Sequence, residues 1–170
     1  VAGTMTGSTT IDSTTLTLGG LQDTFIAKFN SSGTVQTVRQ IKGAGAKTSV
    51  NSLATDSSGN VFAVGVFDNT VDFGGSSLTS KSTPGYPSGT LYLSDAFVAK
   101  YNSSLNLISG MLKNYGDWHD DAAWSAAVDN GGNLIVSGKF LGTINFGGGA
   151  MTAVESNGAW DTFLTKLNGT

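Results

Sequence analysis

The chain has 170 residues, of which 12% are charged, 24 are glycine and none is cysteine. This length fits a single domain over residues 1–170 or a fragment of a larger repeat array, and the absence of cysteine excludes disulfides and thiolate catalysis. The net charge is −3 and the nine basic residues are scattered, so we expect no nucleic-acid partner, because binding phosphates requires clustered Lys and Arg. No apolar run approaches the roughly 20 residues that span a bilayer, so we also expect no membrane span.

A repeated unit of strand, turn and strand organises the chain. We place its copies at approximately residues 1–49, 50–122 and 123–170. The second and third copies align without a gap over residues 50–73 and 123–146, and the matched pairs include Asp56 with Asp129, Gly59 with Gly132, Asn60 with Asn133 and Gly65 with Gly138. Internal repetition at a long fixed period is typical of repeat architectures.

The first copy is recognisable from its second strand onward. Residues 1–3 fit residues 63–65 of the middle copy, so the chain begins in mid-repeat. A Thr-rich connection then leads to a third strand at residues 23–30 and a fourth at residues 35–42. With the four strands of a copy labelled A to D, the first copy supplies BCD.

The middle copy supplies all four strands, and the last supplies three. Strand B of the middle copy lies at residues 61–67, strand C at 95–102 and strand D at 107–113, whereas the last copy ends with its strand C at 161–168. Glycine and asparagine turns lie where four-stranded antiparallel meanders need them. The whole chain therefore reads BCD-ABCD-ABC, ten strands with no convincing helix.

Strand B of the middle copy is apolar on both faces. Residues 61–67 read VFAVGVF, whereas a half-solvated strand would alternate polar and apolar residues. Tandem four-stranded sheets buried on both faces are what a β-propeller produces when its blades stack around an axis. Gly65 and Gly138 within these strands indicate a close approach of neighbouring backbones.

The repeat also resembles a known family. An Asp-x-x-Gly-Asn turn precedes an apolar strand with a glycine, then a Gly-Gly connection and an Asp-x-Phe-x-x-Lys strand, as in residues 129–148 and 95–100. Over nearly the whole chain this pattern is similar to the bacterial β-propeller repeats called SBBP repeats. The resemblance implies an all-β, partial β-propeller of about two and a half four-stranded antiparallel blades. It further implies a scaffold or binding module of a secreted or surface-exposed bacterial protein.

The densest polar group of the chain lies between strands D and A. It consists of Asp117 and four candidate binding residues, Trp118, His119, Asp120 and Asp121. The corresponding residues of the preceding copy carry no carboxylate, which favours a role specific to this copy, such as a metal or sugar contact. The alternative is a solvated loop in which an aspartate closes the turn, since exposed loops collect such residues without function.

The connection at residues 76–94 is seven residues longer than its counterpart in the last copy. It carries Tyr86 and Tyr92 among serines and glycines, which is the composition of adaptable recognition loops. A surface insertion that the fold merely tolerates is an equally good interpretation, because surface loops lengthen at little cost.

Two repeated features have structural interpretations. The Asp-x-x-Gly-Asn turns offer oxygen ligands to calcium, but an aspartate that bonds the backbone two residues on explains them by itself, so we expect no cofactor and no metal. Lys28, Lys100 and Lys166 recur at one position of strand C. A solvated strand end or an ion pair at the edge of a blade explains them better than a basic patch.

Catalysis finds little support in the sequence. A Ser-His-Asp triad could use only His119, and no Gly-x-Ser-x-Gly elbow is present. We therefore expect no enzyme but a non-enzymatic extracellular module for adhesion, scaffolding or assembly on a bacterial surface. The alternative is a lectin-like propeller that binds cell-surface glycans with Trp118, Trp124 or Trp160 as stacking platforms. A hydrolase ranks third.

The ends of the repeat predict a partner. A first unit without strand A and a last unit without strand D leave two sheet edges unpaired, and unpaired edges are templates for pairing with another strand. We expect them to be completed by further segments of a longer chain or by other copies of this one through strand addition.

Overall fold

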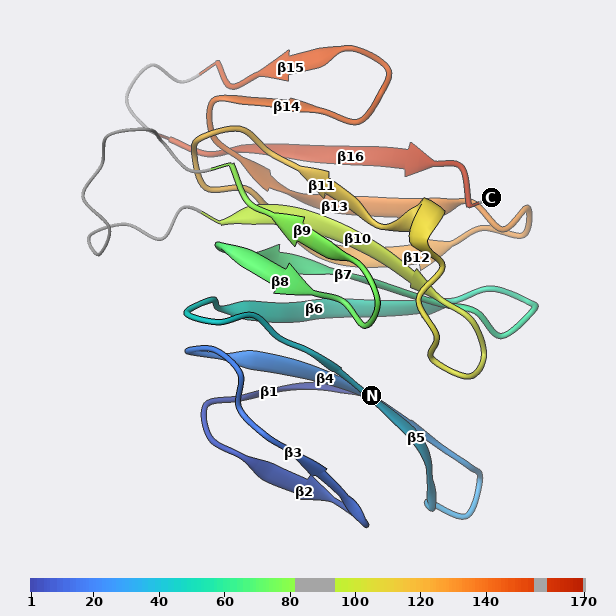
Figure 1. Cartoon of the computed structure of the whole chain (residues 1–170). Helices are drawn as coiled ribbons and strands as arrows, with labels where there is room; N and C mark the ends of the chain where they lie inside the picture. Colours follow the sequence, from blue (N-terminus) through green and yellow to red (C-terminus); the bar gives the residue numbers. More distant parts are fainter. Residues whose placement is uncertain (82–93, 155–158, 170) are drawn as a thin grey trace.

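A computed structural model describes residues 1–81, 94–154 and 159–169, and strands form most of it (Figure 1). Three sheets follow one another along the chain. Sheet 1 contains β1 (Ala2–Met5), β4 (Asp23–Phe29) and β5 (Val35–Ile41). Sheet 2 contains β6 (Thr48–Thr55), β7 (Val61–Phe67), β10 (Asp95–Tyr101) and β11 (Lys113–Tyr115). Sheet 3 contains β12 (Ala122–Val128), β13 (Leu134–Phe140) and β16 (Asp161–Leu167).

The order of strands inside each sheet confirms the predicted repeat. Neighbours in sheet 2 run β11-β10-β7-β6, which is D, C, B and A, while sheet 1 has B, C, D and sheet 3 has A, B, C. All of these pairs are antiparallel. The predicted BCD-ABCD-ABC meander is therefore correct.

Three short hairpins were not predicted, because the sequence suggested plain connections between strands B and C. They pair β2 (Thr9–Ile11) with β3 (Thr14–Leu16), β8 (Thr70–Asp72) with β9 (Ser77–Thr79), and β14 (Thr143–Asn145) with β15 (Ala150–Thr152). Each of these strands has three residues. That is too short for the alternation of apolar and polar residues that reveals a strand in a sequence.

Strand D of sheet 2 begins later than predicted. The sequence placed it at residues 107–113, but β11 covers Lys113–Tyr115 and follows a 3-10 turn at Ser109–Met111. Tyr115 pairs with Ala96 as Ile41 pairs with Thr24 in sheet 1. Because Tyr115 is two residues farther along its copy than Ile41, the 3-10 turn absorbs an insertion that the repeat alignment did not reveal.

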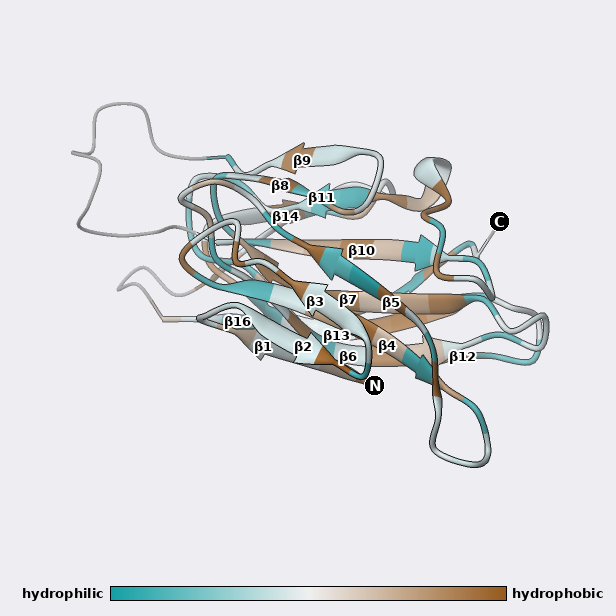
Figure 2. Cartoon of the chain, turned by 60° about the horizontal axis from the view of Figure 1, so that its bottom comes forward, coloured by the Kyte–Doolittle hydropathy of each residue, from teal (hydrophilic) through white to brown (hydrophobic). Residues whose placement is uncertain are grey.

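The sheets stack face to face, and two apolar cores lie between them (Figure 1). The first core joins Ile26 of sheet 1 to Phe97 and Tyr101 of sheet 2, together with Phe73 after β8. The second joins the other face of sheet 2, including Val98, to sheet 3. Figure 2 shows apolar colour along the stacked strands and hydrophilic colour at many of the connecting turns. Sheet 2 is thus buried on both faces, as its sequence predicted.

A glycine on strand B lies against a phenylalanine on strand C in all three sheets. The cross-strand pairs are Gly3 with Phe25, Gly65 with Phe97 and Gly138 with Phe163. A Cβ atom at Gly138 would lie 2.6 Å from the Phe163 ring and would also collide with the Ala122 carbonyl of β12. Gly65 meets the Ser49 carbonyl and the Phe97 ring in the same way. The predicted close backbone approach is confirmed. The absence of a side chain at these glycines also leaves room for the phenylalanine ring that covers them.

Lysines on strand C join successive sheets. Lys28 of sheet 1 donates to the Ser103 carbonyl that follows strand C of sheet 2, at 2.9 Å, and Lys100 of sheet 2 donates to the equivalent Gly169 carbonyl of sheet 3, at 2.6 Å. Lys100 also pairs with Asp56 at 3.4 Å, and Lys166 pairs with Asp129 at 2.6 Å. The predicted strand-end ion pairs are confirmed for Lys100 and Lys166, and the inter-sheet hydrogen bonds are a further role.

We predict that Gly138→Ala lowers the free energy of unfolding by about 1–3 kcal/mol, the usual cost of overpacking a core. The added methyl group must displace the Phe163 ring or the β12 backbone. Gly148→Ala is the matched control, because a Cβ at Gly148 meets no atom within 4 Å. Urea unfolding of both variants measures the difference, and equal stability of the two would contradict the assigned role of Gly138.

Candidate functional site

The Asp-x-x-Gly-Asn turns use their oxygens internally. In the turn after β6, Asp56 Oδ1 accepts hydrogen bonds from the Ser58 and Asn60 amides, and Asp56 Oδ2 accepts one from Asn60 Nδ2 at 2.8 Å. Asp129 repeats this arrangement in the turn after β12. The hydrogen bond from Lys166 and those from Asn133 hold the pKa of Asp129 well below its usual range. These turns have the backbone hydrogen bonds that the turn interpretation predicted.

The loop at residues 117–121 is hydrogen-bonded to the hairpin β14–β15 and to the residue that precedes β10. Asp117 accepts a hydrogen bond from the Thr143 amide of β14 at 2.8 Å, and its other oxygen lies 2.9 Å from His119 Nδ1. Asp120 accepts hydrogen bonds from the amide and hydroxyl of Ser94, which precedes β10. The Trp118 ring meets the imidazole of His119 edge-on and remains half exposed. Trp118 is therefore the most exposed side chain of this loop, while Asp117, His119 and Asp120 are partly exposed.

Asp121 points away from this surface and into the boundary between sheets 2 and 3. Its side chain is fully buried, and so is that of Asp95 at the start of β10. A Cβ at Gly116 would lie 2.6 Å from Asp121 Oδ2 and 2.8 Å from Asp95 Oδ1, so the two carboxyl groups flank the same glycine. The interpretation of this segment as a solvated loop is wrong for Asp121, because the chain turns inward to enter β12.

Each of these two carboxyl groups has one oxygen bonded to a backbone amide. Asp121 Oδ2 accepts from the Asp117 amide at 3.2 Å, and Asp95 Oδ2 accepts from the Lys81 amide at 2.9 Å. Their Oδ1 atoms are buried and accept no hydrogen bond from the described residues. Burial raises the pKa of Asp121 to about 8 and that of Asp95 to about 6, because the ionised forms lose their hydration. The raised pKa of Asp121 therefore favours its protonated form in the folded state at neutral pH.

We predict that the protein loses stability as the pH rises from about 4 to about 8. In this window the folded state holds a proton on Asp121 that the unfolded state has released, so the free energy of unfolding falls with increasing pH. Asp121→Asn keeps the shape and removes the titration. Its melting temperature should exceed that of the wild type at pH 8 and approach it at pH 4. A variant that is less stable than the wild type at pH 8 would contradict this assignment.

Two of the three tryptophans lie around one lysine on sheet 3. Lys139 of β13 places its ammonium 3.4 Å from the centroid of the Trp160 ring and 5.5 Å from that of Trp124 on β12. Both indoles remain partly exposed. The sequence analysis proposed Trp124 and Trp160 as stacking residues but not Lys139, because the predicted strand order does not give the register that places Lys139 beside both rings.

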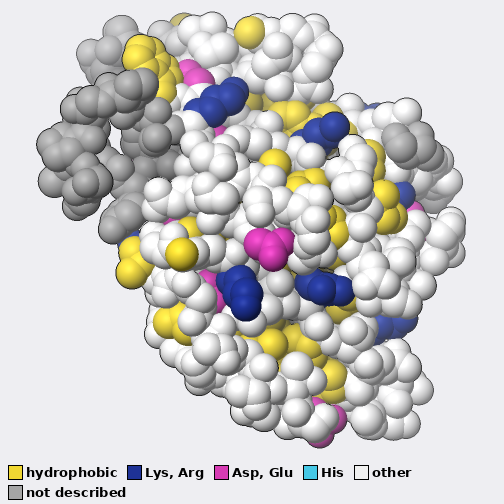
Figure 3. All heavy atoms as spheres, in the orientation of Figure 1, with side chains coloured by type: hydrophobic (Ala, Val, Ile, Leu, Met, Phe, Trp, Pro, Cys, Tyr) yellow, Lys and Arg dark blue, Asp and Glu magenta, His cyan; other side chains and the backbone are white. Residues whose placement is uncertain are grey.

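Tyr86 and Tyr92 lie outside the described residues, and so does most of the long connection that carries them. On the face of the molecule in Figure 3, basic and acidic side chains are scattered among polar and backbone atoms rather than gathered into one patch.

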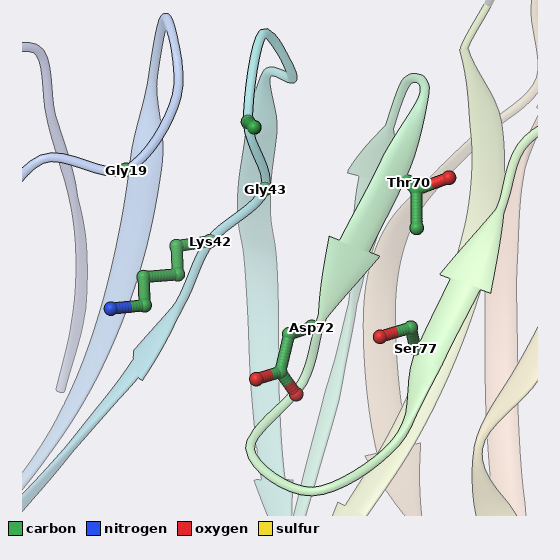
Figure 4. Close-up of a pocket in the computed structure, with 7 residues that line it drawn as sticks. Gly19, Lys42, Gly43, Thr70, Asp72 and Ser77 are labelled. Carbon is green, nitrogen blue, oxygen red and sulfur yellow. The ribbon is translucent and has the colours of Figure 1, made fainter.

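A shallow pocket of about 310 Å³ lies between sheet 1 and the hairpin β8–β9 (Figure 4). Lys42 and Asp72 line it together with backbone from Gly19 and Gly43, and Ser77 lies at its rim. The backbones of Lys42 and Asp72 pair as an isolated antiparallel bridge, which holds the hairpin against sheet 1. Asp72 also accepts hydrogen bonds from the Gly74 and Gly75 amides through Oδ1. The sequence did not predict this pocket, because its two sides come from different copies of the repeat.

Comparison with known proteins identifies one of the repeats. Residues 38–66 match the family described as SBBP, a β-propeller repeat. The matched segment runs from the middle of β5 to the penultimate residue of β7 and so crosses from sheet 1 into sheet 2. No curated protein matches the chain. The match and the stacked four-stranded meander confirm both the predicted family resemblance and the predicted partial β-propeller.

Two features are absent from the described residues. No helix there is long and apolar enough to cross a membrane. Nor do three or more His, Asp or Glu side chains in that part of the chain gather in a way that holds a metal ion.

Proposed function

We propose that the chain is a non-enzymatic structural and binding module, because residues 38–66 match the SBBP β-propeller repeat family. Its place of action is the outside of the cell, on a bacterial surface, where it serves adhesion, scaffolding or assembly. A propeller repeat fits a binding or structural module. The proposed place of action follows from the resemblance to SBBP repeats, and the way this chain uses its polar groups supports the structural role.

The observation that carries the proposal is the use of charged side chains as connections between sheets and turns. Lys100 links the turn at Asp56 to the end of sheet 3, and Asp117 links the loop before β12 to β14. Asp95 and Asp121 bind backbone amides in the interior. Groups committed in this way stiffen a scaffold, whereas catalysis needs acids and bases aimed at a substrate.

We predict no turnover of chromogenic esters or glycosides by the purified chain. The hydrolase alternative depends on His119, whose Nδ1 lies beside Asp117 as the imidazole of a catalytic triad lies beside its aspartate. Steady-state assays of the wild type and of His119→Ala test this. Hydrolysis by the wild type that disappears in His119→Ala would replace the proposed module with an enzyme.

Glycan binding is a second candidate, and the group formed by Trp124, Lys139 and Trp160 favours it. Two partly exposed indoles beside an ammonium offer apolar faces for a sugar ring and a donor for its hydroxyl or carboxylate groups.

A glycan array distinguishes this candidate from a structural module that binds no sugar. If a glycan binds here, Trp124→Ala should abolish the signal and Trp118→Ala, in the loop before β12, should retain it. An array without signal above background for folded wild-type protein would remove the glycan candidate and leave the structural module.

A further inference from the structure

Leu164 on β16 is exposed where the repeat buries its equivalents. Strand C carries Ile26 at this position in sheet 1 and Val98 in sheet 2, which are 2% and 1% exposed. Each lies at the core between its own sheet and the next, whereas Leu164 is 75% exposed. The registers agree, because Ile26 pairs with Ala2, Val98 with Val64 and Leu164 with Ser137. The outer face of sheet 3 is therefore the same face that receives a further sheet in the other two copies.

The complementary half of this interface is open on sheet 1. Phe97 and Tyr101 of β10 share a core with Ile26 of sheet 1, and Phe163 and Leu167 of β16 share a core with Val98 of sheet 2. The equivalent residues of β4 are Phe25, which is half-buried, and Phe29, which is 41% exposed, against 0% for Tyr101 and 9% for Leu167.

The chemistry of sheet 3 is compatible with this packing. Ser137 and Thr162 make its outer face more polar than that of sheet 2, where Val64 and Ala96 occupy the same positions. The same face carries Lys139, opposite Thr162, where sheet 2 carries Val66. Sheet 1 carries Thr24 at the position of Thr162 and is nevertheless buried there against sheet 2. A partly polar face thus supports stacking in this protein.

The lysine of strand C supplies a polar contact for the same interface. Lys28 and Lys100 each donate to the carbonyl that follows strand C in the next sheet, Ser103 and Gly169. In sheet 1 the equivalent carbonyl belongs to Ser31. Lys166 has the ion pair to Asp129 that corresponds to the pair between Lys100 and Asp56.

From these repeated contacts we propose that a second copy of this chain docks head-to-tail, with its sheet 1 on the outer face of sheet 3. Leu164 then packs on Phe25 and Phe29 of the second copy, as Val98 packs in the core with Phe163 and Leu167. Lys166 donates to the Ser31 carbonyl of that copy. The interface joins two different surfaces, so it is heterologous. This proposal rests on the proposed structural role and names the partner, a second copy. The contact is packing between sheet faces rather than strand addition at a sheet edge.

Complementation between two variants tests the proposal, with sedimentation velocity of the 170-residue chain as the measurement. Wild-type protein should associate as its concentration rises. Leu164→Glu and Phe29→Glu should each sediment as monomers, because each destroys one of the two faces and weakens association at least about 100-fold. An equimolar mixture of the two should restore a one-to-one complex, since each variant retains the face that the other lacks. Restoration also shows that both variants are folded.

Three results would overturn the proposal. A wild type that stays monomeric at every concentration shows that the faces do not bind each other. If both variants still associate, the association uses another surface, such as a sheet edge. Variants that become monomeric, keep the wild-type circular dichroism spectrum and fail to combine show that the two faces are not partners. Met151→Glu on β15 is the matched control, because Met151 is exposed but lies outside sheet 3, and it should associate like the wild type.

The same experiment separates this inference from the proposed function. If the wild type is monomeric but still binds cells or glycans and hydrolyses no substrate, the proposed structural and binding role stands. Only the docking of a second copy is then refuted. A glycan that binds at Trp124 and Trp160 competes for the outer face of sheet 3. Its addition should then shift the associated protein toward monomer.

Discussion

The fold depends on the contact between a glycine of strand B and a phenylalanine of strand C. The glycine admits both the phenylalanine ring and the carbonyl of strand A at one point, as Gly138 does with Phe163 and Ala122. In sheets 2 and 3 the ring covers the glycine and presents apolar surface to the preceding sheet, where Ile26 or Val98 enters the same core. One small residue per copy therefore links pairing within a sheet to stacking between sheets.

Polar residues keep the stacked sheets in position. The strand C lysine reaches the carbonyl of the next sheet, and the aspartate that begins strand C holds the connection that precedes it, as Asp23 holds Gly19 and Asp95 holds Lys81. Buried polar groups are costly without partners, so such contacts also reject other arrangements of the sheets. Both boundaries also contain buried side-chain oxygens without a hydrogen-bond partner among the described residues. These belong to Asp23 and Thr48 between sheets 1 and 2, and to the two carboxyl groups of Asp95 and Asp121 between sheets 2 and 3.

The sequence predicted the features that repetition encodes. The strand order, the glycine contacts and the strand C lysines recur between copies, and a recurring pattern can be read without coordinates. The burial of β7 on both faces was predicted from its own continuous apolar run. The short hairpins and the late start of β11 were missed because three-residue strands lack a period and an insertion of two residues shifts the alignment. The direction of Asp121 and the meeting of Lys139 with Trp124 and Trp160 depend on which strands become neighbours. The pocket beside Lys42 and Asp72 likewise arises between copies, which no single copy of the repeat displays.

Hydrogen exchange of the backbone amides tests the stacked arrangement most directly, on protein diluted below the concentration at which it associates. The central claim is that sheet 2 is covered on both faces, whereas sheets 1 and 3 each have one open face. The amides of β7 and β10 should therefore exchange more slowly than those of β4 and β13, which are likewise central strands of their sheets, because opening β7 and β10 requires disrupting two cores. Equal protection of all four strands, or faster exchange in β7 and β10, would contradict the stack.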